Sequence, residues 1–173
     1  MFGWEFPPHI TGGLGTACFG LTKGIAKHNV DVIFVVPKAY GDEDGSSVRL
    51  VAAENIDVAH TSMQLEEFWK HIQYLEISSN IVPYVDPEEF KKIVDSSELE
   101  SSEKSSFTSR KQFKFTGKYG PNLMSEVTRY AIIAATLASE NHFDVIHAHD
   151  WLTYPAGIAA KMEIGRASCR ERV

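Results

Sequence analysis

The chain has 173 residues, of which 43% are hydrophobic, and this length predicts one ordinary domain with a buried core. Its formal net charge of −6 and its lack of a Lys/Arg cluster argue against a nucleic-acid-binding protein, which needs a basic face to neutralise phosphates. Because it has neither an apolar run of about 18 residues nor a secretory leader, we expect a cytoplasmic protein without a membrane anchor.

The first residues predict the end of a β-strand. Residues 1–4 are apolar but fewer than the about five or six of an average strand, so we expect the native strand to begin before Met1. Pro7 and Pro8 follow shortly, and proline lacks the backbone donor that a central strand requires. The strand is therefore expected to end near Glu5.

A helix and a second strand are predicted next. From Gly13 onward, apolar residues recur at helical spacing. Residues 30–36 are rich in β-branched side chains, which is typical of a strand buried on both faces. Strand, turn, helix and strand make a right-handed βαβ unit. The predicted apolar face of the helix consists of Leu14, Cys18, Leu21 and Ile25.

The middle of the chain carries weaker signals. Residues 37–47 form a polar loop, and the acids Asp42 to Asp44 favour a solvated loop over a metal site. Apolar pieces at 56–58 and 72–77 predict further strands, and a helix is expected from Asp86. Residues 96–109 predict a mobile surface insertion.

Basic and aromatic residues alternate between residues 110 and 119. This pattern favours a solvated loop or strand edge. The alternative is a surface that grips a polysaccharide or a nucleic acid, so the role of residues 96–118 stays open.

The last third of the chain repeats the order of strand and helix. Residues 142–150 predict a strand that ends in polar side chains, and Pro155 is expected to open a helix. A longer helix over residues 122–139 precedes them. Its predicted close-packing face consists of Val127, Ala131, Ala134 and Ala138.

Residues 163–173 resemble the translation of a sequencing adapter. We therefore expect a non-native tail there and a native domain over residues 1–162, truncated at both ends. Of the two cysteines, Cys169 falls in this tail and Cys18 remains. No disulfide framework and no metal site are expected from one cysteine.

The glycines of residues 11–15 lie where the first strand passes into the first helix. Gly12 and Gly13 are expected to take positive φ and to keep Cβ atoms out of the path of a ligand, and the helix N-terminus favours a phosphate. A plain tight turn is the alternative. A dinucleotide fold is not favoured, because the third glycine of its motif falls on Cys18 and no acid follows the second strand. No P-loop motif occurs.

A second polar cluster, residues 147–151, ends the last predicted strand. Alternation places His147 and His149 on one face and Asp150 on the other, towards the cleft expected where parallel strands end. The alternative for either histidine is a hydrogen-bonded core residue. A zinc site would need a third ligand at suitable spacing, and none is found.

Residues 4–38 and 144–161 resemble the N-terminal catalytic domain of bacterial glycogen and starch synthases and their GT-B relatives. The resemblance implies an α/β fold, Rossmann-like, with a mostly parallel sheet covered by helices on both faces, as the N-terminal half of a GT-B fold. It also implies a retaining glucosyltransferase that extends an α-1,4-glucan from a nucleotide-glucose. A C-terminal nucleotide-binding domain is expected as partner, and without it we expect the chain to be inactive.

Bacterial synthases carry a lysine directly before Thr-Gly-Gly, where this chain has Ile10. Another GT-B hexosyltransferase, or a non-catalytic glycan- or nucleotide-binding module, therefore remains as an alternative. The resemblance implies no cofactor and no metal, only ADP-glucose or UDP-glucose as donor. It assigns catalytic roles to Glu5, His147 and Asp150, and we expect Gly12, Gly13, Leu14 and Trp151 to bind substrate.

Overall fold

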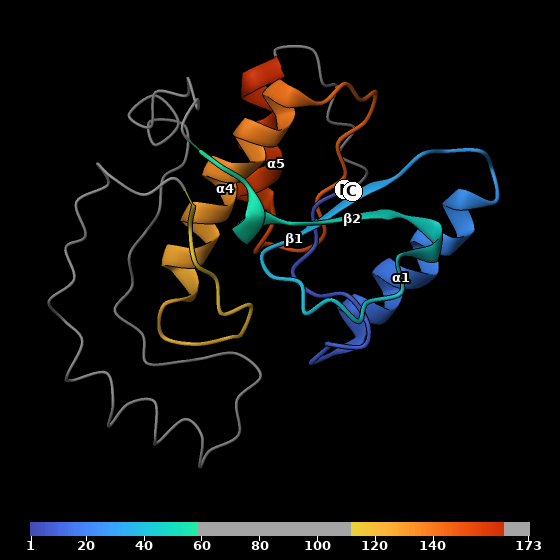
Figure 1. Cartoon of the computed structure of the whole chain (residues 1–173), viewed down its shortest axis with the longest axis horizontal. Coiled ribbons are helices and arrows are strands. Elements are labelled where there is room, and N and C mark those ends of the chain that lie inside the picture. The colour runs from blue at the N-terminus through green and yellow to red at the C-terminus, as the bar shows by residue number, and fades with distance from the viewer. Residues whose placement is uncertain (59–111, 165–173) are drawn as a thin grey trace, which may run out of the picture.

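The computed structural model describes residues 1–58 and 112–164, in which helices and parallel strands alternate (Figure 1). In chain order, these ranges contain helix α1 (Gly13–Ala26), strand β1 (Ile33–Val36), the 3₁₀ turn η1 (Gly45–Ser47), strand β2 (Arg49–Ala52), the 3₁₀ turn η2 (Ala53–Asn55), helix α4 (Leu123–Glu140) and helix α5 (Tyr154–Ile164).

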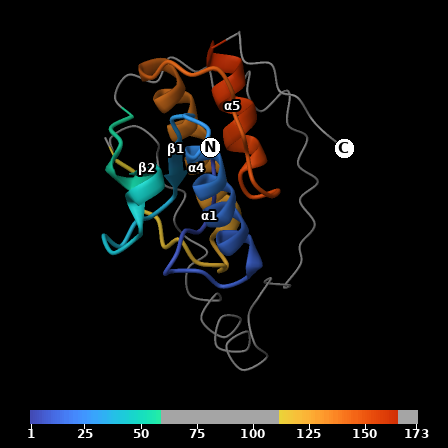
Figure 2. The same cartoon turned by 90° about the vertical axis from the view of Figure 1, so that its right-hand side faces the viewer.

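A parallel sheet lies at the centre of the described residues. β1 pairs with β2, with Phe34 opposite Leu50. The N-terminal residues lie along the other edge of β1, as both views show (Figures 1 and 2). There the Gly3 N–H donates to the Val35 carbonyl oxygen, and the Val35 N–H donates to the Met1 carbonyl oxygen, each at 2.9 Å.

Residues 147–149 extend this sheet on the far side of the N-terminal segment. The Phe2 N–H donates to the His147 carbonyl oxygen at 2.7 Å, and the His149 N–H donates to the Phe2 carbonyl oxygen at 3.0 Å. The spatial order is therefore β2, β1, residues 1–3, residues 147–149, with parallel pairing throughout. The chain leaves the central segment on one side and returns on the other. A topological switch point, where open α/β sheets bind ligands, thus lies between residues 1–3 and 147–149.

Helices cover both faces of this sheet. Phe34 and Val36 pack with Cys18 of α1 in one buried cluster. Val35, which alternates with them, packs with Tyr130 of α4 in a second cluster. α5 contributes Ala156 to that second cluster and runs beside α4 (Figures 1 and 2). The arrangement is compatible with the predicted Rossmann-like fold.

Tyr130 ties the two central segments together from the α4 side. Its buried hydroxyl donates to the carbonyl oxygens of Gly3 and Val35, at 3.0 and 2.7 Å. Burial raises the pKa of this hydroxyl well above its ordinary value, against the opposing effect of the hydrogen bond to Gly3, so it stays a proton donor. The rings of Phe2 and Trp4 pack edge-on against it, with centroids 5.9 and 6.0 Å away.

The helices predicted within the described ranges are confirmed, with one error of orientation. All four residues of the predicted close-packing face of α4 are buried. In α1, however, the buried residues are Gly15, Cys18 and Thr22, whereas Leu21 is 39% exposed. The helix meets the sheet along the row of residues 15, 18 and 22, so the face predicted from apolar spacing is rotated from the one that packs.

The strand predictions are less accurate. β1 covers only the second half of residues 30–36, and Val30 is exposed. The strand expected at residues 56–58 is wrong, because β2 precedes it and the chain is irregular there. Residues 142–150 pair through a single bridge at Ala148 instead of a full strand.

The predictions for residues 72–77, for the helix from Asp86 and for residues 96–109 lie outside the described ranges. Within residues 1–58 and 112–164, none of the helices has the length and apolar character needed to cross a membrane.

Candidate functional site

Glu5 lies just beyond the carboxyl end of the central segment and is only 7% exposed. Its Oε2 accepts the Thr11 backbone N–H at 3.0 Å, which holds the loop of residues 5–11 in front of α1. Within residues 1–58 and 112–164 this is the one hydrogen bond that Glu5 receives. A carboxylate offers about four lone-pair sites, so Glu5 keeps acceptor capacity for the hydroxyls of a ligand.

The glycine turn that follows is open above its first two glycines. A Cβ atom on Gly12 or Gly13 would meet nothing within 4 Å, which confirms that this path is free. The positive φ predicted for them is wrong: Gly12 is extended, with φ −147°, and the positive-φ glycines of the described ranges are Gly41 and Gly117. The turn needs no left-handed residue, because an extended N-cap residue starts a helix directly.

Gly15 is the sterically required glycine of this motif. A Cβ there would lie 2.3 Å from Cγ2 of Ile10 and 3.4 Å from Cβ of Glu5. The Ile10 side chain therefore packs onto the first turn of α1, and Gly15 makes room for it. Leu14, predicted to bind substrate, packs partly against the buried cluster that contains Phe6.

Asp150 ends the segment on the other side of the switch point. It has a left-handed φ of 71°, and its Oδ1 accepts the Trp151 N–H at 2.7 Å. Burial raises the pKa of the Cys18 thiol to about 11; the charges of Asp150 and Glu5 add to this rise, and a backbone hydrogen bond opposes it. Both carboxylates thus lie within electrostatic reach of one buried thiol on α1. Trp151 beside them is largely exposed.

The two histidines share a face, as predicted, and their rings stack with centroids 4.1 Å apart. His147 pairs with the beginning of the central segment, whereas Glu5 lies three residues, or about 10 Å of extended chain, beyond Phe2. Burial, followed by the Met1 amino group, lowers the pKa of His147. The catalytic role of His147 stays a prediction, and its position is less favourable than that of Asp150.

His149 is the more enclosed of the pair. Its Nε2 is buried without a hydrogen-bond partner among the residues that the structure describes. Burial, followed by the charges of His147 and the Met1 amino group, lowers the pKa of His149 to about 4. His149 is therefore neutral at pH 7.

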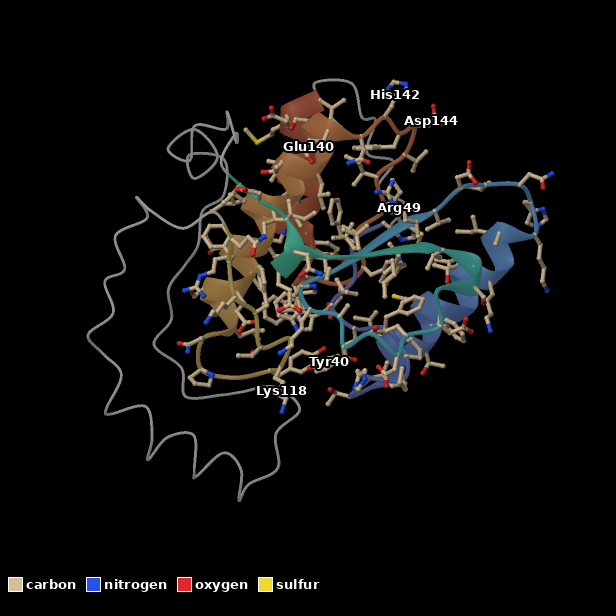
Figure 3. The ribbon with its side chains drawn as sticks, in the orientation of Figure 1. Tyr40, Arg49, Lys118, Glu140, His142 and Asp144 are labelled. Atoms are coloured by element: carbon tan, nitrogen blue, oxygen red, sulfur yellow. The ribbon has the colours of Figure 1, made fainter. Side chains whose placement is uncertain are left out.

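A hollow of about 200 Å³ opens beside Glu5, between the loops of residues 4–11, 38–43 and 117–118. Of the residues predicted for the site, Glu5 alone lines it. Trp4 also reaches it, and its indole Nε1 is buried without a partner among the described residues. Tyr40 and Lys118 lie at its rim (Figure 3). The side chains that give the hollow its character are those of Trp4, Glu5, Lys38, Tyr40, Glu43 and Lys118.

The acidic loop before β2 is held in place, although a solvated loop was predicted. Asp42 Oδ1 lies 2.7 Å from Nε2 of His9, and Asp44 pairs with Lys23 at 3.3 Å. Both carboxylate oxygens of Glu43 accept backbone N–H groups, from Tyr40 at 2.7 Å and Gly41 at 2.9 Å. The paired side chains remain substantially exposed, so the prediction of solvent contact is confirmed for them.

Three side chains of this region could hold a metal ion. The ligand atoms of His9, Asp42 and Glu43 all lie within 4.8 Å of one another. The His9–Asp42 hydrogen bond and the two backbone bonds to Glu43 already occupy these groups. Such an exposed cluster is satisfied without an ion.

The sequence reasoning missed the hollow and its aromatic wall. Tyr40 lies in a loop predicted to be solvated, and Trp4 in a segment predicted to be plain core. Lys118 belongs to the alternation of basic and aromatic residues, which was the signal for a sugar-binding surface. Phe115 of the same stretch is buried against Tyr130, at a centroid distance of 6.4 Å, so only part of that stretch faces solvent.

The fold and the site define an α/β protein whose polar residues gather at the carboxyl ends of parallel strands. The model of the starch synthase catalytic domain family matches residues 1–169. The chain therefore belongs to the starch synthase catalytic domain family, which is a family of glycosyltransferases. None of the curated proteins and none of the solved structures compared with the chain gives a match.

The match confirms the resemblance seen in the sequence. It also takes in residues 163–169, the first part of the expected adapter tail, and α5 continues to Ile164. The domain boundaries stay a prediction.

Proposed function

We propose that the chain is the N-terminal part of a GT-B retaining glucosyltransferase that transfers glucose from ADP-glucose or UDP-glucose to an α-1,4-glucan. The observation that carries this proposal is the arrangement of Glu5, Asp150 and the open turn at Gly12 and Gly13 around the switch point of a starch synthase-type domain. Ligands of open α/β sheets bind at this place.

The turn before α1 would receive the diphosphate of the donor. The first N–H groups of a helix have no partner within the helix, and the helix dipole favours negative charge there. Gly12 and Gly13 leave the approach to these groups open. As the glycosidic C–O bond breaks, fixed backbone donors stabilise the departing charge. Ile10 adds no cation, so further phosphate contacts would come from the C-terminal domain.

Glu5 and Asp150 would orient sugar hydroxyls. In a retaining transfer the acceptor hydroxyl attacks from the face that the diphosphate leaves, so donor and acceptor must both lie at this end of the sheet. The free acceptor capacity of Glu5 suits this task, and the left-handed backbone of Asp150 turns the chain away from the strand direction at the same edge. We assign no covalent nucleophile.

The test is glucose transfer by the protein made from the complete reading frame. Purified protein would be incubated with labelled ADP-glucose or UDP-glucose and an α-1,4-glucan, and label in the polymer measured. We expect transfer from one of the two donors, with retention at the new linkage. A Glu140→Gln variant, which changes an exposed acid at the end of α4, is the matched control and should transfer at the wild-type rate.

Two results would contradict the proposal. Absence of transfer from both donors, with glucan binding intact, would indicate a non-catalytic glycan-binding module. Transfer to a different acceptor or from a different sugar nucleotide would indicate another GT-B hexosyltransferase.

A further inference from the structure

We propose that the hollow beside Glu5 binds one uncharged hexose ring, the terminal unit of the glucan acceptor, with Tyr40 as its aromatic wall and the Trp4 indole N–H as its internal donor. This inference rests on the proposed transfer to a glucan. It adds a site and two specificity-determining residues that the sequence did not indicate.

The Trp4 indole is the first reason. Trp4 is 2% exposed, lines the hollow, and has its Nε1 buried without a partner in the part of the chain that the structure describes. Buried donors are nearly always satisfied, so such an N–H indicates an acceptor that arrives with a ligand. A sugar hydroxyl oxygen accepts a hydrogen bond from an indole and can donate its own proton to a carboxylate such as Glu5.

The charge balance of the hollow favours an uncharged ligand. Its lining includes two carboxylates, Glu5 and Glu43, and two ammonium groups, Lys38 and Lys118. His9 of the same lining is paired with Asp42. A phosphate would gain from the lysines but meet the carboxylates, whereas a polyhydroxyl ring can donate to the latter and accept from the former.

Tyr40 supplies a fixed aromatic surface. It is 46% exposed, its ring lies 4.0 Å from that of His9, and its hydroxyl donates to the Thr116 carbonyl oxygen at 3.4 Å. The Tyr40 N–H also donates to Glu43, which fixes the backbone of the loop. Because the ring is held before a ligand arrives, stacking on the C–H face of a hexose costs little ordering entropy.

The size and place of the hollow identify the part of the substrate that it suits. Its volume of about 200 Å³ is smaller than the roughly 300–1,000 Å³ of pockets that enclose drug-sized molecules, so it suits one ring instead of a whole nucleotide-sugar. Glu5 forms one wall, and its partner Thr11 directly precedes Gly12. The ring in the hollow would therefore lie next to the turn proposed for the donor diphosphate.

Maltotetraose binding to the 173-residue chain tests this site directly. The indole N–H signals of the ¹⁵N-labelled chain would be followed by NMR, and the Trp4 signal identified with a Trp4→Phe variant. We expect that signal to move downfield and to exchange more slowly with solvent on saturation. Tyr40→Ala should weaken the Kd for maltotetraose about tenfold, which corresponds to about 1.4 kcal/mol.

Two further variants control for the loss of a surface aromatic. Tyr40→Phe keeps the ring and should bind within about twofold of wild type. Tyr154→Ala removes a tyrosine that is 53% exposed on α5, outside the hollow, and should leave the Kd unchanged.

Three results would overturn the inference. The Trp4 signal could remain in place at saturating maltotetraose, or Tyr40→Ala could bind as tightly as wild type. Inorganic phosphate could instead move the Trp4 signal in a manner abolished by Lys38→Met, which would identify an anion site.

The transfer assay separates this inference from the proposed function. Glucan transfer at the wild-type rate in a Tyr40→Ala full-length enzyme would remove the acceptor site and leave the glucosyltransferase intact. Maltotetraose contact at Trp4 without any glucose transfer would remove the enzyme and leave the sugar site intact.

Discussion

Two buried carboxylates, Glu5 and Glu126, show how differently the same group is used at the two sides of the sheet. Glu126, in the first turn of α4, is 3% exposed and accepts three hydrogen bonds, from the Thr116 N–H at 3.0 Å, the Thr116 hydroxyl at 2.7 Å and the Gly117 N–H at 3.3 Å. Glu5 is nearly as buried but accepts one, from Thr11, within the described residues.

The difference separates a structural acid from one available to a ligand. Glu126 fixes the loop of residues 116–118, and its acceptor sites are largely used. Glu5 borders a hollow and keeps free acceptor capacity. Burial alone does not distinguish the two, but the number of satisfied acceptor sites does.

The largest effect is expected on the ligand side of this comparison. Asp150→Asn removes a charge beside Glu5, and asparagine tolerates the left-handed φ of residue 150, so the fold should persist. If Asp150 orients a sugar in the transition state, kcat/KM for glucan synthesis by the full-length enzyme should fall about 100-fold. Asp44→Asn, at an exposed acid paired with Lys23, is the control and should keep the wild-type rate.

The opposite pattern is expected on the structural side. Glu126→Gln removes the charge that three donors share, so the free energy of unfolding should fall by about 2 kcal/mol. Urea denaturation followed by circular dichroism measures this loss. Transfer activity per folded molecule should change less than about threefold. A stable but inactive Glu126→Gln protein would show that the two carboxylates have been assigned the wrong way round.

His149 extends the comparison to a buried base without a partner. Its pKa in the folded chain is about 4, whereas its ordinary value is 6.5, so the unfolded state binds more protons between these values. The free energy of unfolding should therefore fall as the pH drops from about 6.5 to 4, by an amount on the order of 1 kcal/mol because the ring is only partly buried. In His149→Gln this part of the pH dependence should disappear from urea denaturation curves.

The smallest effect concerns the glycine motif itself. Gly15→Ala would push against Ile10, so we expect a loss of about 1 kcal/mol in the free energy of unfolding. Gly20→Ala lies on the same helix with open space around it and should gain about 0.5–1 kcal/mol through helix propensity. Equal effects at the two positions, measured by thermal denaturation, would contradict the packing described for Ile10.

The helices and the location of the site could be predicted because their signals are local. Apolar spacing and helix-start residues located α1, α4 and α5. The rule that parallel strands end at one edge brought Glu5 and Asp150 to the same part of the sheet.

The missed features depend on packing between distant segments. The exposed position of Leu21 follows from how α1 meets the sheet. β2 gave no stronger apolar signal than residues 56–58, and pairing with β1 selects it. The hollow combines Trp4, Tyr40 and Lys118 from three loops, and no spacing within one loop indicates that they meet.

The most direct test of this account is the transfer rate of full-length Glu5→Gln and Glu126→Gln, measured in one assay and corrected for the folded fraction of each. If Glu5 is the acid that receives sugar hydroxyls, Glu5→Gln should lose about 100-fold or more in kcat/KM while its free energy of unfolding changes by less than about 1 kcal/mol. Glucan synthesis at the wild-type rate by Glu5→Gln would contradict the account.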